Sequence, residues 1–538
     1  MKKKILIFIA IGLTAFAQSS KSTKGGAGNS KRTPSRPAVQ RASSERPQAN
    51  SPASSALRRQ LYQALQLSQS GQYQAAAIQL FNLARRPELQ ADKAQIKYIL
   101  GLMLGEMGLN QVAAFQFVDV IRTNHPKYTR QAIEKLASVA DELGDDTLIN
   151  YAMSRVDVSD VPENNRDMVQ FRIGEIKMRS QRFDEAIRVF SKIGLGSRYY
   201  SQALYHKGLA FLELNRPQEA ANVFQAMISS RRKAGVTDTN RVAAQLALAR
   251  ALYQRKDWDG AVAAYAEIPR DHFLWHEALY EQSWAMLRGA RFRSVLSNFQ
   301  SMHSPFYEDD YNPESFLLRS IVYLYICKYE EMEKVLGLFE KTYSPVRSQI
   351  GVFLNNNSNP LHYFNEVEKW QSQKRLATED RSGLRIPYMV ANKISKSGNV
   401  RRALNYLRRL ETERKAIESN GGLRSTALGR YAVKVISNRA RNTKINIGES
   451  AKVQMANMKD ELKDAFEQVS FVRYEMISAQ KEVVKKRIQG TDLPEARIDD
   501  NRTRSFYVQN GYQYYPFNGE YWLDEVGNYH FLGKSSCE

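Results

Sequence analysis

The sequence predicts an all-α protein, built mainly as an α-solenoid of stacked helix pairs. Between residues 56 and 345, two amphipathic helical stretches separated by a short turn return eight times. A small residue occupies the same place in the first stretch of each unit, namely Ala64, Gly101, Ala137, Gly174, Gly208, Ala249, Ser283 and Ser320. Their successive spacings are 37, 36, 37, 34, 41, 34 and 37 residues, which are typical of helical repeat proteins.

The small residue predicts how each unit packs. Together with an alanine in the second stretch, it allows the two helices to approach closely. A bulky residue four positions after that alanine, such as Phe117 after Ala113, is expected to fill the gap to the next unit. Each pair exposes an apolar face that only its neighbour can cover, so the units are expected to stack.

Residues 56–345 resemble a tetratricopeptide array, although several units lack the family's Trp and its closing Pro. The resemblance implies a protein-interaction scaffold whose first helices line a concave groove. By the family's geometry, six residues face that groove: Tyr205, Leu209, Arg250, Tyr253, Tyr280 and Trp284. Aromatic and Arg side chains dominate binding hot spots, but the same aromatics could instead fill the core between helices.

The first residues predict export. Three lysines precede an apolar run from Ile5 to Phe16, and small residues around Ala17 form a cleavage site. Twelve residues make a helix of about 18 Å, too short for a hydrocarbon core of about 30 Å. We therefore interpret residues 1–17 as a cleaved signal peptide, the alternative being an uncleaved anchor. No later stretch reaches 18 consecutive apolar residues, so no transmembrane segment is expected in the mature chain.

Residues 18–55 are predicted to be a disordered basic linker, because Ser, Pro, Gly, Lys and Arg dominate and large apolar side chains are scarce. The linker is either a solvated tether or an arm that holds the protein near an anionic surface. The net charge of +22 makes acidic partners physically plausible, and export argues against nucleic acid as one of them.

Residues 346–490 are predicted to form a helical extension with long helices. Val453, Met455, Met458, Leu462, Phe466, Val469 and Val472 follow at helical spacing and suggest one apolar seam. A hairpin of long helices that caps the array is the simplest interpretation. Between residues 401 and 444, twelve Lys or Arg face three Glu. This basic stretch is either a solvated helix face or a docking surface for an acidic partner or an anionic envelope polymer.

Residues 500–538 contain short aromatic runs separated by Asn510-Gly511, Asn518-Gly519 and Gly527-Asn528. Asn-Gly pairs between such runs predict an antiparallel β-meander, which either packs on the helices or binds a partner. The two cysteines, Cys327 and Cys537, could form one bridge in an oxidising compartment or remain a buried and a free thiol.

No catalytic, cofactor-binding or metal site is expected. His272 and His276 lie four residues apart, but no Glu of a zinc-protease motif stands between them and no third ligand is evident. Nucleophile-elbow, phosphate-loop and dinucleotide motifs are missing from the sequence.

A narrower resemblance rests on two stretches, Ser304 to Tyr329 and Tyr515 to Glu525, together with the export signal and the array. They are similar to the periplasmic tetratricopeptide proteins of the deltaproteobacterial adventurous gliding-motility machinery. The resemblance implies a non-enzymatic scaffold in the periplasm or at the outer membrane, with other envelope proteins as partners. Two alternatives stay open: an assembly factor for outer-membrane proteins or cell-wall synthesis, and a cell-wall-remodelling enzyme with its site in the C-terminal half.

Overall fold

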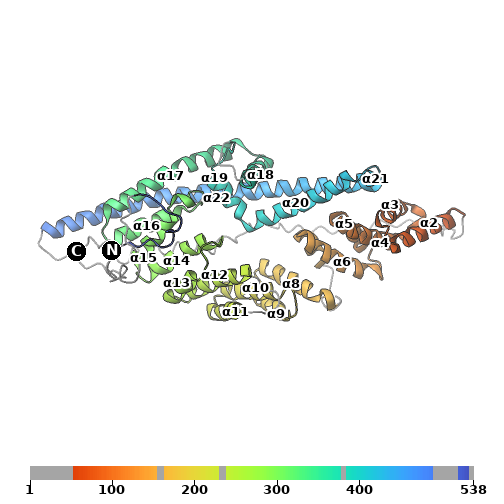
Figure 1. The fold of residues 1–538 in the computed structure, drawn as a ribbon, viewed down its shortest axis with the longest axis horizontal. Helices are drawn as coiled ribbons and strands as arrows, with labels where there is room; N and C mark the ends of the chain where they lie inside the picture. The colour runs from red at the N-terminus through yellow and green to blue at the C-terminus, as the bar shows by residue number, and fades with distance from the viewer. Residues whose placement is uncertain (1–51, 154–162, 230–237, 377–382, 489–518, 532–538) are drawn as a thin grey trace, which may run out of the picture. The chain divides into compact units, whose positions relative to one another are not determined.

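A computed structural model of the chain describes residues 52–153, 163–229, 238–376, 383–488 and 519–531 (Figure 1). All regular elements within these ranges are helices. The predicted signal peptide and most of the predicted linker lie outside the described residues. None of the described helices combines the length and the apolar character that a membrane span requires.

Eight helix pairs follow one another along the chain, as the repeated pattern predicts (Figure 1). The pairs are α2 (Pro52–Gln69) with α3 (Tyr73–Leu83), α4 (Lys93–Glu106) with α5 (Asn110–Thr123), α6 (Tyr128–Leu143) with α7 (Asp146–Met153), α8 (Glu163–Arg179) with α9 (Phe183–Phe190), α10 (Tyr200–Glu213) with α11 (Pro217–Ser229), α12 (Asp238–Gln254) with α13 (Trp258–Ala266), α14 (Trp275–Arg288) with α15 (Phe292–Met302), and α16 (Pro313–Tyr325) with α17 (Tyr329–Asn356). The helices of each pair pack on each other, and each second helix packs on the first helix of the next pair.

The small residue of each first helix is buried in all eight pairs. At three of these positions a bulky ring of the second helix leaves no room for a side chain. A Cβ atom on Gly101 would lie 2.6 Å from Phe117, one on Gly174 2.3 Å from Phe190, and one on Gly208 2.4 Å from Phe224. The bulky residue therefore packs against the small residue of its own pair, and Phe190 also reaches the next pair, where its ring stacks on His206.

The turn inside each pair contains one residue with a left-handed backbone conformation, always seven positions after the small residue. These residues are Gly71, Gly108, Gly144, Gln181, Asn215, Lys256, Ala290 and Cys327. Glycine adopts this conformation without steric cost, whereas a residue with a Cβ atom is strained there. The common backbone geometry shows that the eight units share one register even where the glycine is missing.

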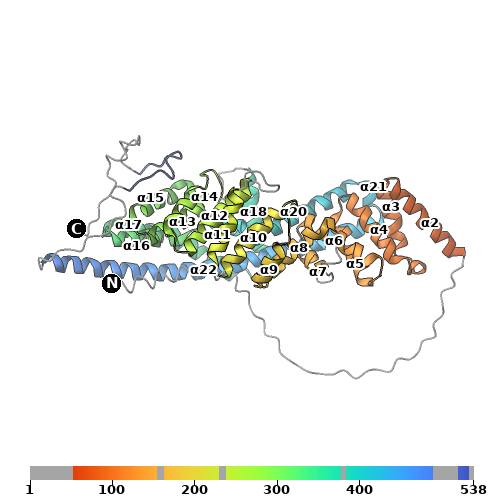
Figure 2. The same cartoon turned by 90° about the horizontal axis from the view of Figure 1, so that it is seen from below.

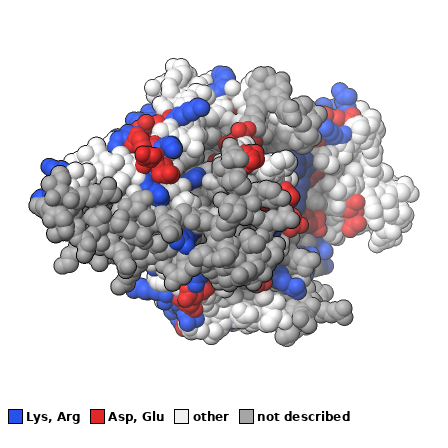
Figure 3. Space-filling view, turned by 60° about the vertical axis from the view of Figure 1, so that its left-hand side comes forward, with Lys and Arg blue, Asp and Glu red and all other residues white. Residues whose placement is uncertain are grey.

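Charged side chains on the repeats neutralise one another within and between helices. Lys177 pairs with Glu185 at 2.9 Å, and Arg216 pairs with Glu219 at 2.8 Å. On the face drawn in Figure 3, basic and acidic side chains are accordingly interspersed, so that neither sign dominates.

The helical extension begins later than predicted. Helix α17 runs through Pro345 to Asn356, so the last pair does not end at residue 345. The Asn-rich break then separates it from α18 (Pro360–Leu376). The remaining helices are α19 (Tyr388–Lys396), α20 (Gly398–Ser419), α21 (Gly421–Arg424) and α22 (Ala427–Ile488). Helices α20 and α22 lie side by side and form the predicted hairpin (Figures 1 and 2).

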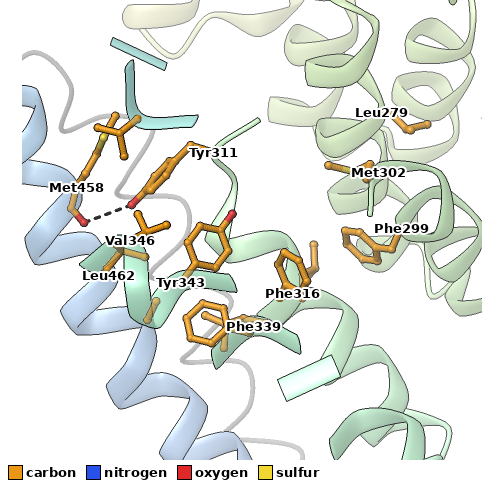
Figure 4. Packing of buried hydrophobic residues seen from close by; sticks show 14 of the residues in the cluster. Leu279, Phe299, Met302, Tyr311, Phe316, Phe339, Tyr343, Val346, Met458 and Leu462 are labelled. Atoms are coloured by element: carbon orange, nitrogen blue, oxygen red, sulfur yellow. Dashed lines mark hydrogen bonds between the residues drawn. The ribbon is translucent and has the colours of Figure 1, made fainter. Parts of the chain in front are cut away.

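The middle of α22, around Lys444 and Gly448, packs on α18, and α22 also packs on the last repeat pair. Met455, Leu462 and Val469 of the predicted seam are buried there, whereas Val453 is 59% exposed and does not belong to the seam. Figure 4 shows the junction, where the Tyr311 hydroxyl donates to the Met458 carbonyl at 3.3 Å. The seam thus docks α22 onto the array.

The hairpin also packs on the N-terminal pairs. Helix α22 contacts α3 and α5, and α20 contacts α5. A buried polar cluster fixes this contact. Both carboxylate oxygens of Glu413 on α20 accept the Gln111 backbone N–H at 3.1 Å, at the start of α5. The N-terminal amides of a helix attract a carboxylate, but burial dominates here and raises the pKa of Glu413 to about 8. Asp145, in the α6–α7 turn, pairs with Arg439 of α22 and accepts from the Tyr406 hydroxyl at 3.0 Å.

The buried apolar side chains form three clusters. One joins the N-terminal pairs to α20 and the first part of α22, and another joins the C-terminal pairs to α18, α19 and the rest of α22. The third lies between α10, α11 and α12, and the hairpin contributes no described residue to it. The middle of the array is therefore held by repeat packing, while both ends are also braced by the hairpin.

Residues 519–531 pack on α15 and α16, and within them no strand is present. The Gly527 N–H donates to Ser301 Oγ at 2.8 Å, and the Phe531 N–H donates to Ser297 Oγ at 2.9 Å. The rest of the predicted β-meander over 500–538 lies outside the described residues. Cys327 is disulfide-bonded, and Cys537 also lies outside the described residues.

The contact between the small and the bulky residue can be tested within one helix. We expect Gly101→Ala to lower the free energy of unfolding by about 1–3 kcal/mol, because the new methyl group overlaps the Phe117 ring. Gly105→Ala, on the same helix with nothing within 4 Å of the new Cβ atom, is the matched control. It should raise stability by up to about 1 kcal/mol, through helix propensity alone. Urea denaturation of both variants measures this difference, and equal effects would contradict the packing account.

Candidate functional site

The middle pairs carry the candidate site on the side formed by their first helices. Helix α10 packs on the first helix before it, α8, and on the one after it, α12. The register places a row of side chains from each of these helices on one surface, with the small residues Gly174, Gly208 and Ala249 underneath. None of α8, α10 and α12 packs substantially against the described part of α20 or α22.

A pocket of about 280 Å³ opens between these three helices. Its lining residues are Phe171, Arg172 and Glu175 from α8, Ser201, Gln202, Tyr205 and His206 from α10, and Asn240 and Ala243 from α12. Three of the residues are aromatic rings and most of the others carry amide, hydroxyl or charged groups. This combination suits one large side chain that presents both an apolar body and a polar end.

The charges of the pocket are held in place by its walls. Arg172 forms ion pairs with Asp141 and with Glu175, the latter at 2.6 Å. His206 stacks on Phe190 with ring centroids 5.7 Å apart. Burial lowers the pKa of His206, and nearby guanidinium groups, including Arg172, act in the same direction. The imidazole is therefore neutral at pH 7, so one ring nitrogen can donate a hydrogen bond and the other can accept one.

The structure places the six predicted groove residues on the first helices α10, α12 and α14, where all six are half-buried. Tyr205 lines the pocket. Leu209 packs against the middle core, and the ring of Tyr253 meets Trp258 edge-on at 5.1 Å. Their role in binding stays a prediction.

Arg250 and Tyr280 are engaged within the scaffold. Arg250 donates two hydrogen bonds to the Glu281 carboxylate, at 2.8 and 2.7 Å, and also pairs with Glu277 at 2.6 Å. Tyr280 donates to Glu314 at 2.5 Å and bonds with Trp284. These contacts tie α12 to α14 and α14 to α16, so the two side chains set the spacing of the first helices.

The sequence could have yielded part of the pocket that our prediction missed. Tyr205 and Leu209 lie three positions before and one position after the small residue Gly208. The same two positions around Gly174 are Phe171 and Glu175, and these two residues also line the pocket. Arg172 and His206 lie two positions before the small residue, an offset that the resemblance does not place in the groove. Their position follows from the local packing of α8 on α10.

The two histidines singled out in the sequence lie in the loop before α14 and at its start. His276 faces Asp310 at 3.4 Å and its ring packs at a tilt against Tyr307, with centroids 4.5 Å apart, while the His272 ring accepts the Leu274 N–H at 3.2 Å. Among the residues that the structure describes, no group of three or more His, Cys, Asp or Glu side chains is arranged to hold a metal ion.

The Arg250–Glu281 pair offers a test of this geometry. Glu281 is buried, so Arg250→Met leaves an uncompensated carboxylate, and stability should fall by about 3 kcal/mol. The exposed Arg255 directly follows the same helix, in the turn between α12 and α13, and Arg255→Met should change stability by less than about 0.5 kcal/mol. Adding Glu281→Gln to Arg250→Met should restore most of the loss, because the amide keeps an acceptor for Tyr265. Equal urea midpoints for the two single variants would show that the pair does not hold the groove.

Comparison with known proteins finds similarity to helical repeats of the tetratricopeptide type. The tetratricopeptide repeat family model matches residues 171–235 and 237–272. No curated protein matches the chain. Among solved structures, a tetratricopeptide repeat protein from Parabacteroides merdae is 15% identical, with 54% of this chain and 93% of that one covered and a TM-score of 0.22. Yeast Tom70 is 12% identical, with 81% and 99% covered and a TM-score of 0.26.

The family match spans the helices that form the pocket, from within α8 to the end of α13. The pairs on either side repeat the same small residue and the same left-handed turn. Residues 171–235 and 237–272 are therefore similar to the tetratricopeptide repeat family, and the pairs on either side share the same helical-repeat architecture.

Proposed function

We propose that this protein is a non-catalytic interaction scaffold whose middle repeats, α8 to α13, bind a segment of a partner protein. The distribution of the apolar cores supports this most directly. The hairpin of α20 and α22 shares cores with the repeats at both ends, whereas the core of α10 to α12 contains no described hairpin residue. The first helices of the middle pairs thus keep a surface on which a partner can dock.

The pocket supplies the specificity of this surface. Its volume of about 280 Å³ suits one large side chain and is small for a free metabolite. Phe171 and Tyr205 would contact the body of that side chain, and Glu175, Gln202 and Asn240 would bond its polar end. Aromatic or arginine side chains of a partner have this amphipathic character and dominate binding hot spots.

We further propose that the scaffold acts in the cell envelope, in a complex of the gliding-motility type. The signal-peptide pattern of residues 1–17 and the resemblance of the two quoted stretches support this location and this role. Tetratricopeptide arrays assemble other proteins, which agrees with a structural component of a larger complex.

The test uses one variant that blocks the pocket and one that does not. Gln202 is exposed at the pocket rim, and Gln225 is exposed on α11, a second helix that contributes no residue to the pocket lining. The full chain and the variants Gln202→Trp and Gln225→Trp are used to capture proteins from cross-linked envelopes. We expect Gln202→Trp to lose a specific partner by at least tenfold, while Gln225→Trp retains it.

The identity of the lost partner then decides the finer proposal. Motility components would support it. Outer-membrane assembly or wall-synthesis proteins would replace it with the assembly-factor alternative. Equal capture by both variants would contradict the pocket as the binding site. Wall hydrolysis by the purified full chain would contradict the non-catalytic scaffold.

A further inference from the structure

The exposed side of α20 carries basic residues at a regular spacing. Arg401, Arg408 and Lys415 are exposed and seven residues apart, and Arg402 and Arg409 form a second row beside them. Seven residues are close to two helical turns, so successive charges in a row lie about 10 Å apart on nearly the same side of the helix. The start of α22, alongside α20, adds the exposed Arg430, Lys434 and Arg441, and the exposed Arg424 lies in α21 (Figure 1).

The basic residues of this stretch separate into two groups. Three are half-buried and each pairs with a carboxylate: Arg414 with Glu418, Arg439 with Asp145, and Lys444 with Glu411. The nine exposed ones form no salt bridge within the described part of the chain. Some are oriented by neutral groups, as where Arg408 donates to Asn405 at 2.6 Å. In contrast to the mixed face of Figure 3, the surface of α20 to early α22 therefore carries uncompensated positive charge.

The same surface lacks apolar anchors. None of the exposed large hydrophobic side chains of the described chain lies between residues 401 and 444. Helices that bind in a membrane interface need an apolar face that enters the acyl boundary. Seven of the nine exposed cations are arginines, whose planar fork matches carboxylate oxygens in pairs. These features favour an acidic polypeptide over a lipid surface.

The spacing of the charges agrees with such a partner. An extended chain advances about 3.3 Å per residue, so carboxylates three residues apart lie about 10 Å apart. We propose that the basic rows of α20 and early α22 bind an extended, Asp- and Glu-rich segment of another protein. Arg402 of the second row lies close enough to His206 of the pocket to lower its pKa, but the row of Arg401, Arg408 and Lys415 contributes no residue to the pocket lining. Removing that row therefore tests this proposal separately from the function proposed above.

The experiment measures binding of fluorescently labelled deca-glutamate to the full chain by anisotropy at low ionic strength. The variant Arg401→Gln, Arg408→Gln, Lys415→Gln removes one row. The matched control, Arg188→Gln, Lys192→Gln, Lys334→Gln, removes three exposed cations outside the 401–444 stretch and so has the same net charge. We expect the row variant to weaken binding about tenfold and the control less than twofold, with both effects reduced by added salt. All six positions are exposed, so unchanged thermal unfolding checks that both variants fold.

Three outcomes would overturn the proposal. Equal weakening by both triple variants would show that net charge alone attracts the peptide. Binding to phosphatidylglycerol vesicles without binding to deca-glutamate would assign the rows to a membrane surface. Tighter binding of oligothymidylate than of deca-glutamate, lost in the row variant, would assign them to nucleic acid.

Discussion

The whole array depends on the contact between one small residue in each first helix and one bulky residue in the second. At Gly101, Gly174 and Gly208 a phenylalanine ring occupies the space where a side chain would begin. This contact fixes the separation of the two helices, and the left-handed residue seven positions further on fixes the turn between them. Because the buried small residue and the left-handed turn recur in every pair, the first helices meet in a regular way and their side chains form one continuous surface.

A second constraint decides which part of that surface is used within the molecule. The hairpin packs on the N-terminal pairs through a polar cluster around Glu413 and Asp145, and on the C-terminal pairs through the apolar seam of α22. Terminal repeats need a cover for their apolar faces, and the hairpin provides one at each end. The middle pairs are already covered by their neighbours, so they keep their first helices available for a partner.

The repeats could be predicted from the sequence because their constraints are local. The small residue, the amphipathic period and the turn all lie within one unit, and the eight predicted register positions are the buried ones. The local sequence pattern did not predict the structure where a residue adopts a backbone conformation that its type does not favour. Gln181, Lys256 and Ala290 adopt the left-handed turn although nothing in their chemistry favours it. Pro345 lies inside a helix that the sequence pattern would end there.

The docking of the hairpin could not be predicted, because its contacts join residues far apart in the chain. Glu413 meets Gln111 across some three hundred positions, and no periodic pattern links them. The candidate site was predicted in part. The family offsets led to Tyr205, but Arg172 and His206 emerge from the way α8 packs on α10. Arg250 and Tyr280, chosen as binding residues, also hold neighbouring first helices together.

Native-state hydrogen exchange on the free full-length protein tests the central claim most directly, because it compares the braced and the unbraced parts of one molecule. We expect faster amide exchange in α10, α11 and α12, most of whose buried apolar residues lie in a core with no described hairpin residue, than in α4, α5, α16 and α17. Equal or slower exchange in the middle helices would contradict the claim that the hairpin braces the two ends and leaves the middle open.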